Sequence, residues 1–254
     1  MRASELPHIT ADLLTRVRER SPRVHCVTNA VAQTFTANVL LAAGAIPSMT
    51  ISADEIGAFV ARADAVLINL GTFDAERRDA TATALEVASE EGVPWVLDPV
   101  FIDRSEPRGA YAKSLLAHKP RAIRLNRPEF LALSGQDADG GTLMKFALDT
   151  LSIVALTGSV DIVADGAGHV ALENGHPLMA RVTAMGCAAS ALAGAFLAVE
   201  GDALKATAAA LLAFGVAGEV AGSEARGPGS LAIGIVDALY ALDADTLAQK
   251  ARVR

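Results

Sequence analysis

The sequence lacks the features that attach a protein to nucleic acid, to a membrane or to an oxidising compartment. Its 254 residues carry a net charge of −7 and no basic cluster, which disfavours binding to nucleic acid or to an anionic membrane. Its two cysteines, Cys26 and Cys187, form no CxxC pair. No segment reaches the roughly 18 uncharged apolar residues of a spanning helix, and MRASELPHITADLLTRVRER lacks the apolar core of a signal peptide. We therefore expect a cytoplasmic protein with reduced thiols.

Several common catalytic motifs are also missing. The sequence contains no GxxxxGK[ST] phosphate loop, no GxSxG elbow, and no HExxH among its five histidines. GAGHVA (166–171) matches GxGxxA, but it falls in an expected hairpin turn rather than between a strand and a helix. If a phosphorylated ligand binds here, local geometry must hold it, because the overall charge is negative.

What the sequence does contain is an alternation of short apolar segments with helical patterns. A first amphipathic helix is expected at about residues 4–19, and other clear helices at 34–43 and 74–91. Solidly apolar strands separated by helices are typical of a parallel sheet covered on both faces. Right-handed crossovers then give a three-layer α/β/α sandwich with a mostly parallel central sheet. The expected strands are VHCVT (24–28), PSMTI (47–51), AVLINL (65–70), WVLDPV (95–100), AIRLN (122–126) and IVALT (153–157).

The pattern changes after residue 157. VDIVADGAGHVALENG (160–175) indicates a β-hairpin with an Asp165-Gly166 turn, added to the edge of the sheet. The C-terminal third is nearly all helix, at about 187–200, 202–223 and 230–242. Since no linker, repeat or charge block divides the chain, we expect one domain over residues 1–254.

Polar residues follow the expected strands, where ligands bind in open α/β sheets. They are Thr28, Asn29, Asn69, Gly71, Thr72, Asp98, Asn126, Glu129, Thr157 and Gly158. Asp98 alone is compatible with a strand-ending Asp-Pro turn, and Glu129 with a first-turn glutamate that faces a helix dipole. Both carboxylates nevertheless fall on the same rim of the sheet. A Mg²⁺ ion with its waters could be held between them.

Cys187 lies where a helix begins, directly after Gly186. One interpretation is a small buried apolar residue, the usual fate of a free cysteine. The other is functional, because unpaired N–H groups at a helix N-terminus favour anions and lower the pKa of a thiol. Gly186 lets the backbone approach a ligand closely. From these residues alone the two interpretations are about equal.

Several further segments occur in a specific order and spacing. They are VHCVTNAVAQTFTANVLLAAGAIPSM (24–49), LINLGT (67–72), VPWVLDPV (93–100), IRLNRPE (123–129), ALTGSVDIVADG (155–166), NGHPL (174–178), GPGS (227–230) and DALYAL (237–242). With them the chain resembles the hydroxyethylthiazole kinase family, the thiamin-salvage member of the ribokinase-like fold. The resemblance implies phosphorylation of the primary alcohol of 4-methyl-5-(2-hydroxyethyl)thiazole by ATP with Mg²⁺, in a homotrimer.

The resemblance also implies a role for individual residues. Cys187 takes the place of the aspartate base of related kinases, with a contributory rather than indispensable role. The substrate-binding positions are Asn29, Met49, Gly71, Thr72 and Ala184. The ATP-binding positions are Arg124, Thr157, Gly158 and Gly186, and the metal positions are Asp98 and Glu129.

Two departures from the family pattern bear on these roles. The family's Gly-x-Gly-Cys turn reads Ala184-Met-Gly-Cys187 here, so Ala184 adds either backbone strain or a methyl group that narrows the site. FIDRSEPR (101–108) replaces a glycine-rich segment, and Arg104 or Arg108 could supply charge near the phosphates. Two alternatives therefore stay open. They are a kinase for a hydroxymethylpyrimidine or pyridoxal type of alcohol, and a relative that binds nucleotide or thiazole with weakened catalysis.

Overall fold

The computed structural model describes residues 2–254 and contains one eight-stranded sheet with the order β2-β1-β3-β4-β5-β6-β7-β8. Neighbouring strands from β2 to β6 are parallel, whereas β6, β7 and β8 pair antiparallel. The strands are β1 (Arg23–Val27), β2 (Ile46–Ser48), β3 (Ala65–Asn69), β4 (Trp95–Asp98), β5 (Ala122–Leu125), β6 (Ile153–Leu156), β7 (Asp161–Ala164) and β8 (His169–Leu172).

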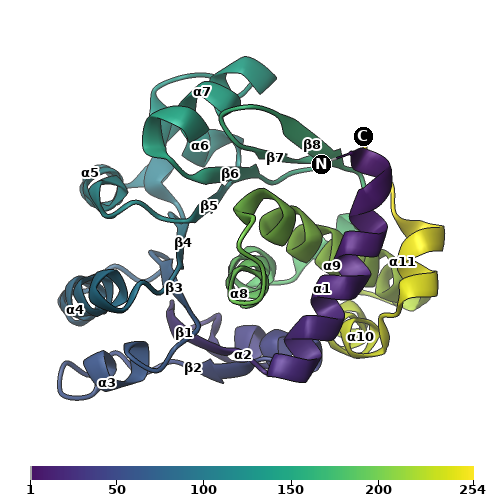
Figure 1. The fold of residues 1–254 in the computed structure, drawn as a ribbon, viewed down its shortest axis with the longest axis horizontal. Helices are drawn as coiled ribbons and strands as arrows, with labels where there is room; N and C mark the ends of the chain where they lie inside the picture. Colours follow the sequence, from purple (N-terminus) through teal and green to yellow (C-terminus); the bar gives the residue numbers. More distant parts are fainter. Residues whose placement is uncertain (1) are drawn as a thin grey trace.

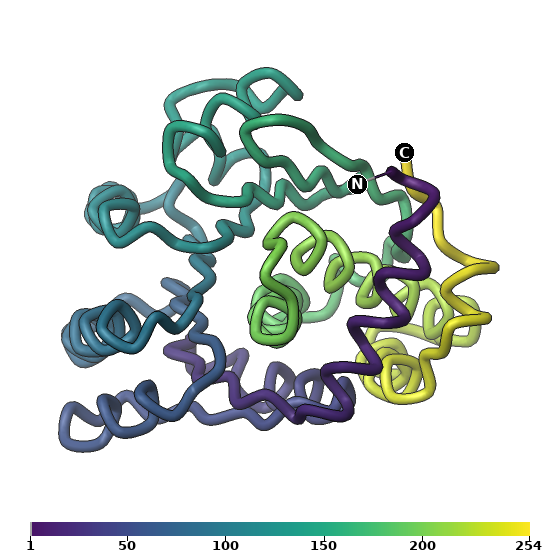
Figure 2. The backbone as a smooth tube through the Cα atoms, viewed as in Figure 1, coloured from purple at the N-terminus to yellow at the C-terminus, as the bar shows by residue number. Residues whose placement is uncertain are grey.

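Helices cover both faces of the sheet (Figure 1). On one face lie α3 (Ile56–Val60), α4 (Ala75–Glu91), α5 (Glu106–Leu115), α6 (Arg127–Ser134) and α7 (Gly140–Thr150). On the other lie α1 (Leu6–Arg20), α2 (Gln33–Ala43), α8 (Met185–Leu197), α9 (Ala203–Glu224), α10 (Pro228–Ala241) and α11 (Ala244–Lys250). The tube in Figure 2 shows the sheet curving around α8, which lies on the concave side.

The strand sequences explain this two-sided covering. Successive side chains of a strand point to opposite faces, so Leu67 joins the core beneath α8 and α9 while Val66 and Ile68 join the core beneath α3 to α7. All three side chains are fully buried. The small residues of α8 let it lie close to the sheet, since a Cβ on Gly194 would contact Val24 at 3.5 Å. The three-layer α/β/α arrangement predicted from the sequence is therefore confirmed.

Most predicted elements agree with the structure within one to three residues. All six predicted strands are present, and residues 161–172 form the predicted antiparallel hairpin at the edge of the sheet. α8 begins two residues before the predicted start, at Met185. The sequence analysis did not identify α11, a seven-residue helix capped by Asp243.

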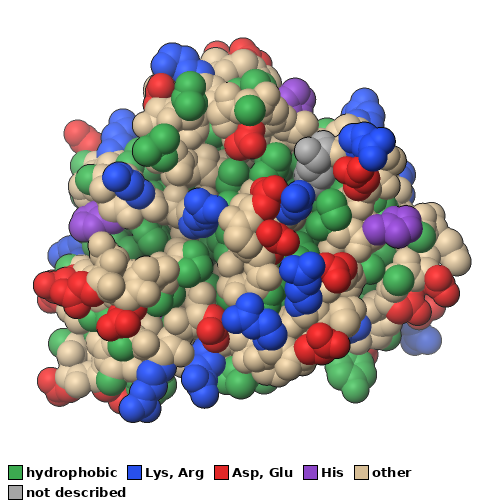
Figure 3. Space-filling view, viewed as in Figure 1, with side chains coloured by type: hydrophobic (Ala, Val, Ile, Leu, Met, Phe, Trp, Pro, Cys, Tyr) green, Lys and Arg blue, Asp and Glu red, His purple; other side chains and the backbone are tan. Residues whose placement is uncertain are grey.

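One helix in the described part of the chain, α9, is long and apolar enough to cross a membrane, but 78% of its most apolar window is buried within the protein. It is therefore a core helix of this fold. In the view of Figure 3, basic and acidic side chains alternate over the surface, and no large basic patch forms on this face.

Candidate active site

The predicted site residues meet at the carboxyl ends of the central strands. β1 leads to Asn29, β3 ends at Asn69, and β4 ends at Asp98. These three strands are adjacent in the sheet. The strand order reverses between β1 and β3, because β2 adds to one side of β1 and the later strands to the other. Ligands of open α/β sheets bind at such a switch point.

A chain of side-chain hydrogen bonds connects the residues at this point. The Asn29 amide Nδ2 donates to Cys187 Sγ at 3.3 Å and to Asn69 Oδ1 at 2.9 Å. Asn69 Nδ2 donates in turn to Asp98 Oδ2 at 2.7 Å. The hydroxyl of Ser190, one turn into α8, donates to the same carboxylate oxygen at 3.0 Å. The thiol and the carboxylate are thus the two ends of one buried polar network.

Asp98 is fully buried, and its second oxygen, Oδ1, has no hydrogen-bond partner. The nearest cation is Arg124, whose Nη1 lies 3.8 Å from Oδ1. The pKa of Asp98 is raised to about 6, because burial and the nearby Glu129 outweigh the lowering effects of Arg124 and the two hydrogen bonds. A buried carboxylate oxygen without a partner is costly unless a cation or a donor occupies the adjacent space.

Cys187 lies in the first turn of α8, as predicted, but the expected lowering of its pKa is wrong. Burial and the nearby Asp98 carboxylate raise the pKa of the Cys187 thiol to about 11. Hydrogen bonds from Asn29 and Asn69 and the charge of Arg124 lower this pKa but do not offset the two raising effects. Cys187 is therefore a neutral thiol at physiological pH, and its sulfur accepts a hydrogen bond from Asn29. The other cysteine, Cys26, is buried in the core and has no role at the site.

Two glycines allow the close packing of this region. A Cβ on Gly71 would lie 2.9 Å from Asn29 Cβ, so glycine is required for Asn29 to reach its partners. A Cβ on Gly186 would lie 2.8 Å from Arg124 Cζ and closer still to Nη1. The absence of a side chain at Gly186 therefore lets the Arg124 guanidinium lie against the first turn of α8.

The residue at the predicted turn, Ala184, has a left-handed backbone with φ 68° and ψ 3°. Of the two effects expected for this position, strain is the one that the structure supports. A non-glycine residue with this φ costs roughly 1–2 kcal/mol. Ala184 is also the residue before α8, and its carbonyl accepts the Ala188 N–H at 2.9 Å.

Glu129 has a capping role in addition to its nearness to Asp98. Its Oε2 accepts the Asn126 N–H at 2.9 Å, which completes a capping box at the start of α6. Its Oε1 accepts the Phe101 N–H at 3.0 Å and so anchors the loop after β4. Each carboxylate oxygen keeps a further lone pair for a water or a metal ion.

The two predicted metal residues, Asp98 and Glu129, fit Mg²⁺ because one buried carboxylate oxygen of Asp98 has no partner. Mg²⁺ is usually bound through one or two carboxylates, with waters and substrate phosphates as the other ligands. The unpartnered Oδ1 of Asp98 would supply one such ligand, and Glu129 is close enough to influence the Asp98 pKa. Among residues 2–254 no cluster of three or more His, Cys, Asp or Glu forms a complete protein cage. This is the donor set of an ion that phosphates help to bind.

Apart from Gly186, the predicted ATP-binding residues lie on β5 or directly after β6. The Arg124 side chain extends from β5 and is 18% exposed. Thr157 follows β6, and its hydroxyl donates to the Leu125 carbonyl at 3.4 Å. The Gly158 N–H donates to Asp161 at 2.9 Å. Asp161 was missed in the sequence analysis. Its pKa is raised to about 6, because burial outweighs the lowering effects of the Gly158 hydrogen bond and of Arg124.

The remaining substrate positions lie on the β1–β2 side of the site. The Thr72 hydroxyl accepts the Ala30 N–H at 3.3 Å and so ties the segment after β3 to the segment after β1. Met49 directly follows the edge strand β2 and packs, half-buried, against the core that contains α8. None of the described contacts links Met49 to Cys187.

Residues 101–108 form a short 3₁₀ helix (Ile102–Arg104) and the start of α5. They lie beside Glu129, and their two arginines have different surroundings. Arg108 donates to the Val100 carbonyl at 3.0 Å, and its guanidinium lies 5.8 Å from the Phe73 ring centre. Its side chain is therefore held against the segment that follows β4. Arg104 is 74% exposed and lies over the ring of Phe101.

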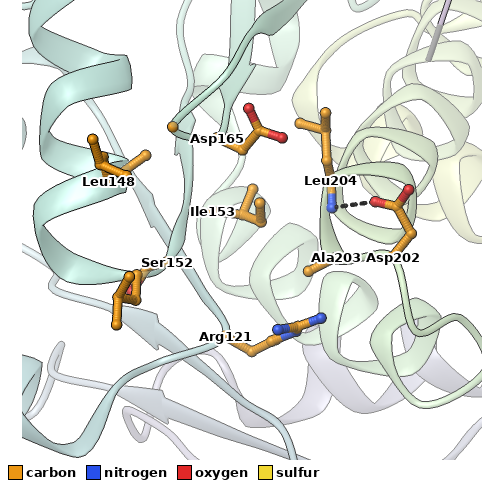
Figure 4. A pocket seen from close by; sticks show the side chains of 11 residues that line it. Arg121, Leu148, Ser152, Ile153, Asp165, Asp202, Ala203 and Leu204 are labelled. Carbon is orange, nitrogen blue, oxygen red and sulfur yellow. Dashed lines mark hydrogen bonds between the residues drawn. The ribbon is translucent and has the colours of Figure 1, made fainter.

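A hollow of about 280 Å³ lies at the opposite edge of the sheet, near the starts of β6 and α9 (Figure 4). Its polar groups already have partners. Asp202 caps α9, Asp165 accepts two N–H groups of its own turn, and Arg121 donates to the Gly201 carbonyl. None of the predicted site residues lines this hollow, and its charged groups are already paired.

The fold is of the ribokinase-like class. A ribokinase-like superfamily protein from Enterococcus faecalis superimposes with a TM-score of 0.69 at 13% identity, covering 90% of this chain and 93% of that one, a likeness of fold alone. The chain belongs to the hydroxyethylthiazole kinase family, whose model matches residues 14–245. This confirms the resemblance predicted from the sequence, and the protein is therefore an enzyme of the kinase class.

Two relatives illustrate the match. The hydroxyethylthiazole kinase of Granulibacter bethesdensis is 44% identical over 98% of this chain and 96% of its own. The structure of a hydroxyethylthiazole kinase protein from Pyrococcus horikoshii OT3 superimposes with a TM-score of 0.93 at 40% identity, covering 97% of this chain and 98% of that one.

Proposed function

We propose that the protein transfers the γ-phosphoryl group of ATP to the primary alcohol of 4-methyl-5-(2-hydroxyethyl)thiazole, with Mg²⁺, as a step of thiamin salvage. Membership in the family supports a thiazole substrate and the use of ATP. The observation that carries the proposal is the position of Asp98. Its unpartnered buried oxygen lies beside Arg124 and is linked through two asparagines to the thiol at the start of α8.

Asp98 and Glu129 would hold the Mg²⁺ ion, with waters and phosphate oxygens as its other ligands. An ion held there would supply positive charge that neutralises the phosphates during the transfer. The chain's own contribution here is to bury Asp98 and to fix its orientation through Asn69 and Ser190. A fixed ligand does not have to reorganise during the reaction.

Arg124 and the first turn of α8 would bind the negative charge of the phosphates. The guanidinium lies against Gly186, where the N–H groups of the first turn have no partner within the helix. A planar guanidinium and a helix N-terminus both bind phosphate oxygens well. Thr157 and Gly158 would border the same phosphates at the end of β6.

Cys187 would orient the alcohol rather than remove its proton at the start of the reaction. A thiol whose pKa lies near 11 is protonated at neutral pH and is a poor base. The loose transition state of phosphoryl transfer demands little early deprotonation of the alcohol. The role of Cys187 is therefore contributory.

The thiazole ring would bind on the β1–β2 side of Cys187. Asn29, Gly71, Thr72 and Ala184 would border it. The polarizable thioether of Met49 suits an aromatic sulfur heterocycle.

Assembly as a homotrimer is supported by the family resemblance and by the surface next to this region. Val31, Leu41 and the edge-strand residue Ile46 are 76%, 57% and 48% exposed. A neighbouring subunit that covers them would also lie close to Met49. Light scattering after gel filtration measures the mass, and a monomer would contradict the trimer without touching the proposed reaction. A cytoplasmic location stays a prediction.

The test of the reaction is release of ADP in the presence of ATP, Mg²⁺ and the thiazole alcohol, for the wild type, Asp98→Ala and Cys187→Ala. We expect thiazole-dependent turnover, a loss of about 10²–10³-fold in kcat for Asp98→Ala, and about 10-fold for Cys187→Ala. A general base would contribute about 10²–10⁴-fold, so a loss in that range would show that the thiol removes the proton.

Folded wild-type protein without thiazole-dependent turnover would refute the proposal. The same assay with hydroxymethylpyrimidine and pyridoxal then identifies another kinase activity. Calorimetric binding without any turnover would instead identify a binding protein.

A further inference from the structure

The orientation of the Asn69 side chain is fixed by a backbone group. The Gly71 N–H, which can only donate, lies 3.0 Å from Asn69 Oδ1. The amide oxygen of Asn69 must therefore face Gly71, and its NH₂ group must face Asp98. An ionised carboxylate only accepts, so the 2.7 Å contact with Asp98 Oδ2 agrees with this orientation.

The orientation of Asn29 follows from that of Asn69. Since the Asn69 oxygen accepts, the group of Asn29 that meets it at 2.9 Å must be the NH₂ group. This group has a second hydrogen, and Cys187 Sγ lies 3.3 Å away to accept it. The sulfur is thereby used as an acceptor on the Asn29 side. Its S–H hydrogen is left to point away from Asn29.

The other end of the network is fixed in the same way. Asp98 Oδ2 accepts from both Asn69 and Ser190, which leaves only Oδ1 toward Arg124 and the proposed metal position. Asn69 itself is 2% exposed. It is enclosed by these partners and does not need to touch either substrate.

From this network we propose that Asn69 is a positioning residue that couples the phosphate-binding end of the site to the alcohol-binding end. This inference rests on the proposed function of Asp98 and Cys187. One carboxamide donates to the carboxylate and accepts from the amide that holds the thiol. Asn69 thereby leaves Oδ1 as the free oxygen of Asp98. Through Asn29 it also leaves the S–H hydrogen of Cys187 directed away from Asn29.

Other side chains of similar size cannot both donate to Asp98 and accept from Asn29. Aspartate would keep acceptors for Gly71 and Asn29 but would place a second carboxylate against Asp98. Leucine would fill a similar volume and lose both contacts. The two substitutions therefore test the donor and the whole connection separately.

The experiment measures kcat and both KM values for the wild type, Asn69→Asp, Asn69→Leu, Cys187→Ala and the double variant Asn69→Leu/Cys187→Ala. Ser152→Ala, another buried polar position, lies at the start of β6 far from the site and serves as the matched control. We expect kcat to fall about 10- to 100-fold in both Asn69 variants, with the KM for ATP changed less than about threefold. The loss caused by Asn69→Leu should be smaller in the Cys187→Ala background, because part of its effect acts through the thiol.

Several results would overturn the inference. Asn69 variants with a lower melting temperature but wild-type kcat would show that Asn69 is merely structural. Fully multiplicative losses in the double variant would show that Asn69 does not act through Cys187. If Asn69→Leu does not fold, Asn69→Asp decides alone, and wild-type kcat in that variant refutes the coupling. A wild-type enzyme inactive toward the thiazole would refute the proposed function instead, which keeps the two failures distinct.

Discussion

Replacing Ala184 by glycine should stabilise the protein, although the position lies at the start of α8 beside the candidate site. Ala184 is held at φ 68°, where the Cβ of an L-residue meets the following carbonyl. Glycine adopts this conformation without that contact. The substitution therefore removes strain without removing any side-chain hydrogen bond.

The magnitude follows from two opposing effects. The left-handed conformation costs a non-glycine residue roughly 1–2 kcal/mol. Glycine has more freedom in the unfolded chain, which takes back about 0.4–1 kcal/mol. We therefore expect Ala184→Gly to raise the free energy of unfolding by about 0.5–1 kcal/mol. For a chain of this size that corresponds to a rise of about 1–4 °C in melting temperature.

A matched control separates backbone strain from effects of the site. Lys119 also has a left-handed backbone, with φ 53°, at the exposed end of a short 3₁₀ helix (Leu116–His118). Lys119→Gly should give a similar stabilisation and leave kcat and KM unchanged. Both variants are compared with the wild type by differential scanning calorimetry and by urea unfolding.

A drop in the stability of Ala184→Gly alongside a gain for Lys119→Gly would refute this reasoning. It would mean that the Ala184 methyl contributes more in packing than its backbone loses in strain. In that case the alanine fills space at the start of α8, and the change should also alter the KM for the thiazole.

Two further predictions concern single residues. In Gly186→Ala the new methyl group would displace Arg124, so we expect kcat/KM for ATP to fall by about 10²-fold in a folded protein. The control variant Gly201→Ala has open space around its Cβ and should have wild-type kinetics. Equal kinetics of the two variants would contradict the packing of Arg124 on Gly186. Burial lowers the pKa of His25 below 6.5, although a hydrogen bond to Thr50 and the charge of Glu55 act in the opposite direction. As the pH falls below 6.5, the unfolded chain therefore takes up the proton first. The free energy of unfolding should then decrease, by at most about 1.4 kcal/mol per pH unit. His25→Gln should flatten this slope in urea unfolding measured at several pH values, and an unchanged slope would exclude His25 as its source.

The sheet could be predicted from the sequence because its strands are buried on both faces. Segments such as AVLIN in β3 are continuously apolar and short, and helical patterns of the expected length separate them. The edge hairpin was equally clear from its Asp165-Gly166 turn. α11 was not found, because it has only seven residues and only Leu247 is buried.

The positions of the site residues could be predicted only to the extent that they follow strands. Asn69 and Asp98 end adjacent strands, so their nearness follows from the sheet order. Ser190 and Asp161 gave no such signal. Ser190 comes from α8, more than ninety residues after Asp98, and meets it only through the packing of that helix on β4. Whether Gly186 faces a ligand or a side chain of the protein also depends on that packing.

The misjudged pKa of Cys187 has the same origin. At the level of sequence, a helix N-terminus is visible and favours the thiolate. Burial of the thiol and the approach of Asp98 appear only in the folded chain, and both favour the neutral form. A thiolate here would add a second negative charge near Asp98, where the phosphates of ATP are proposed to bind. A neutral thiol avoids this repulsion and can still form hydrogen bonds with an alcohol. The burial and charge around Cys187 therefore support the proposal that this cysteine orients the alcohol without acting as a base.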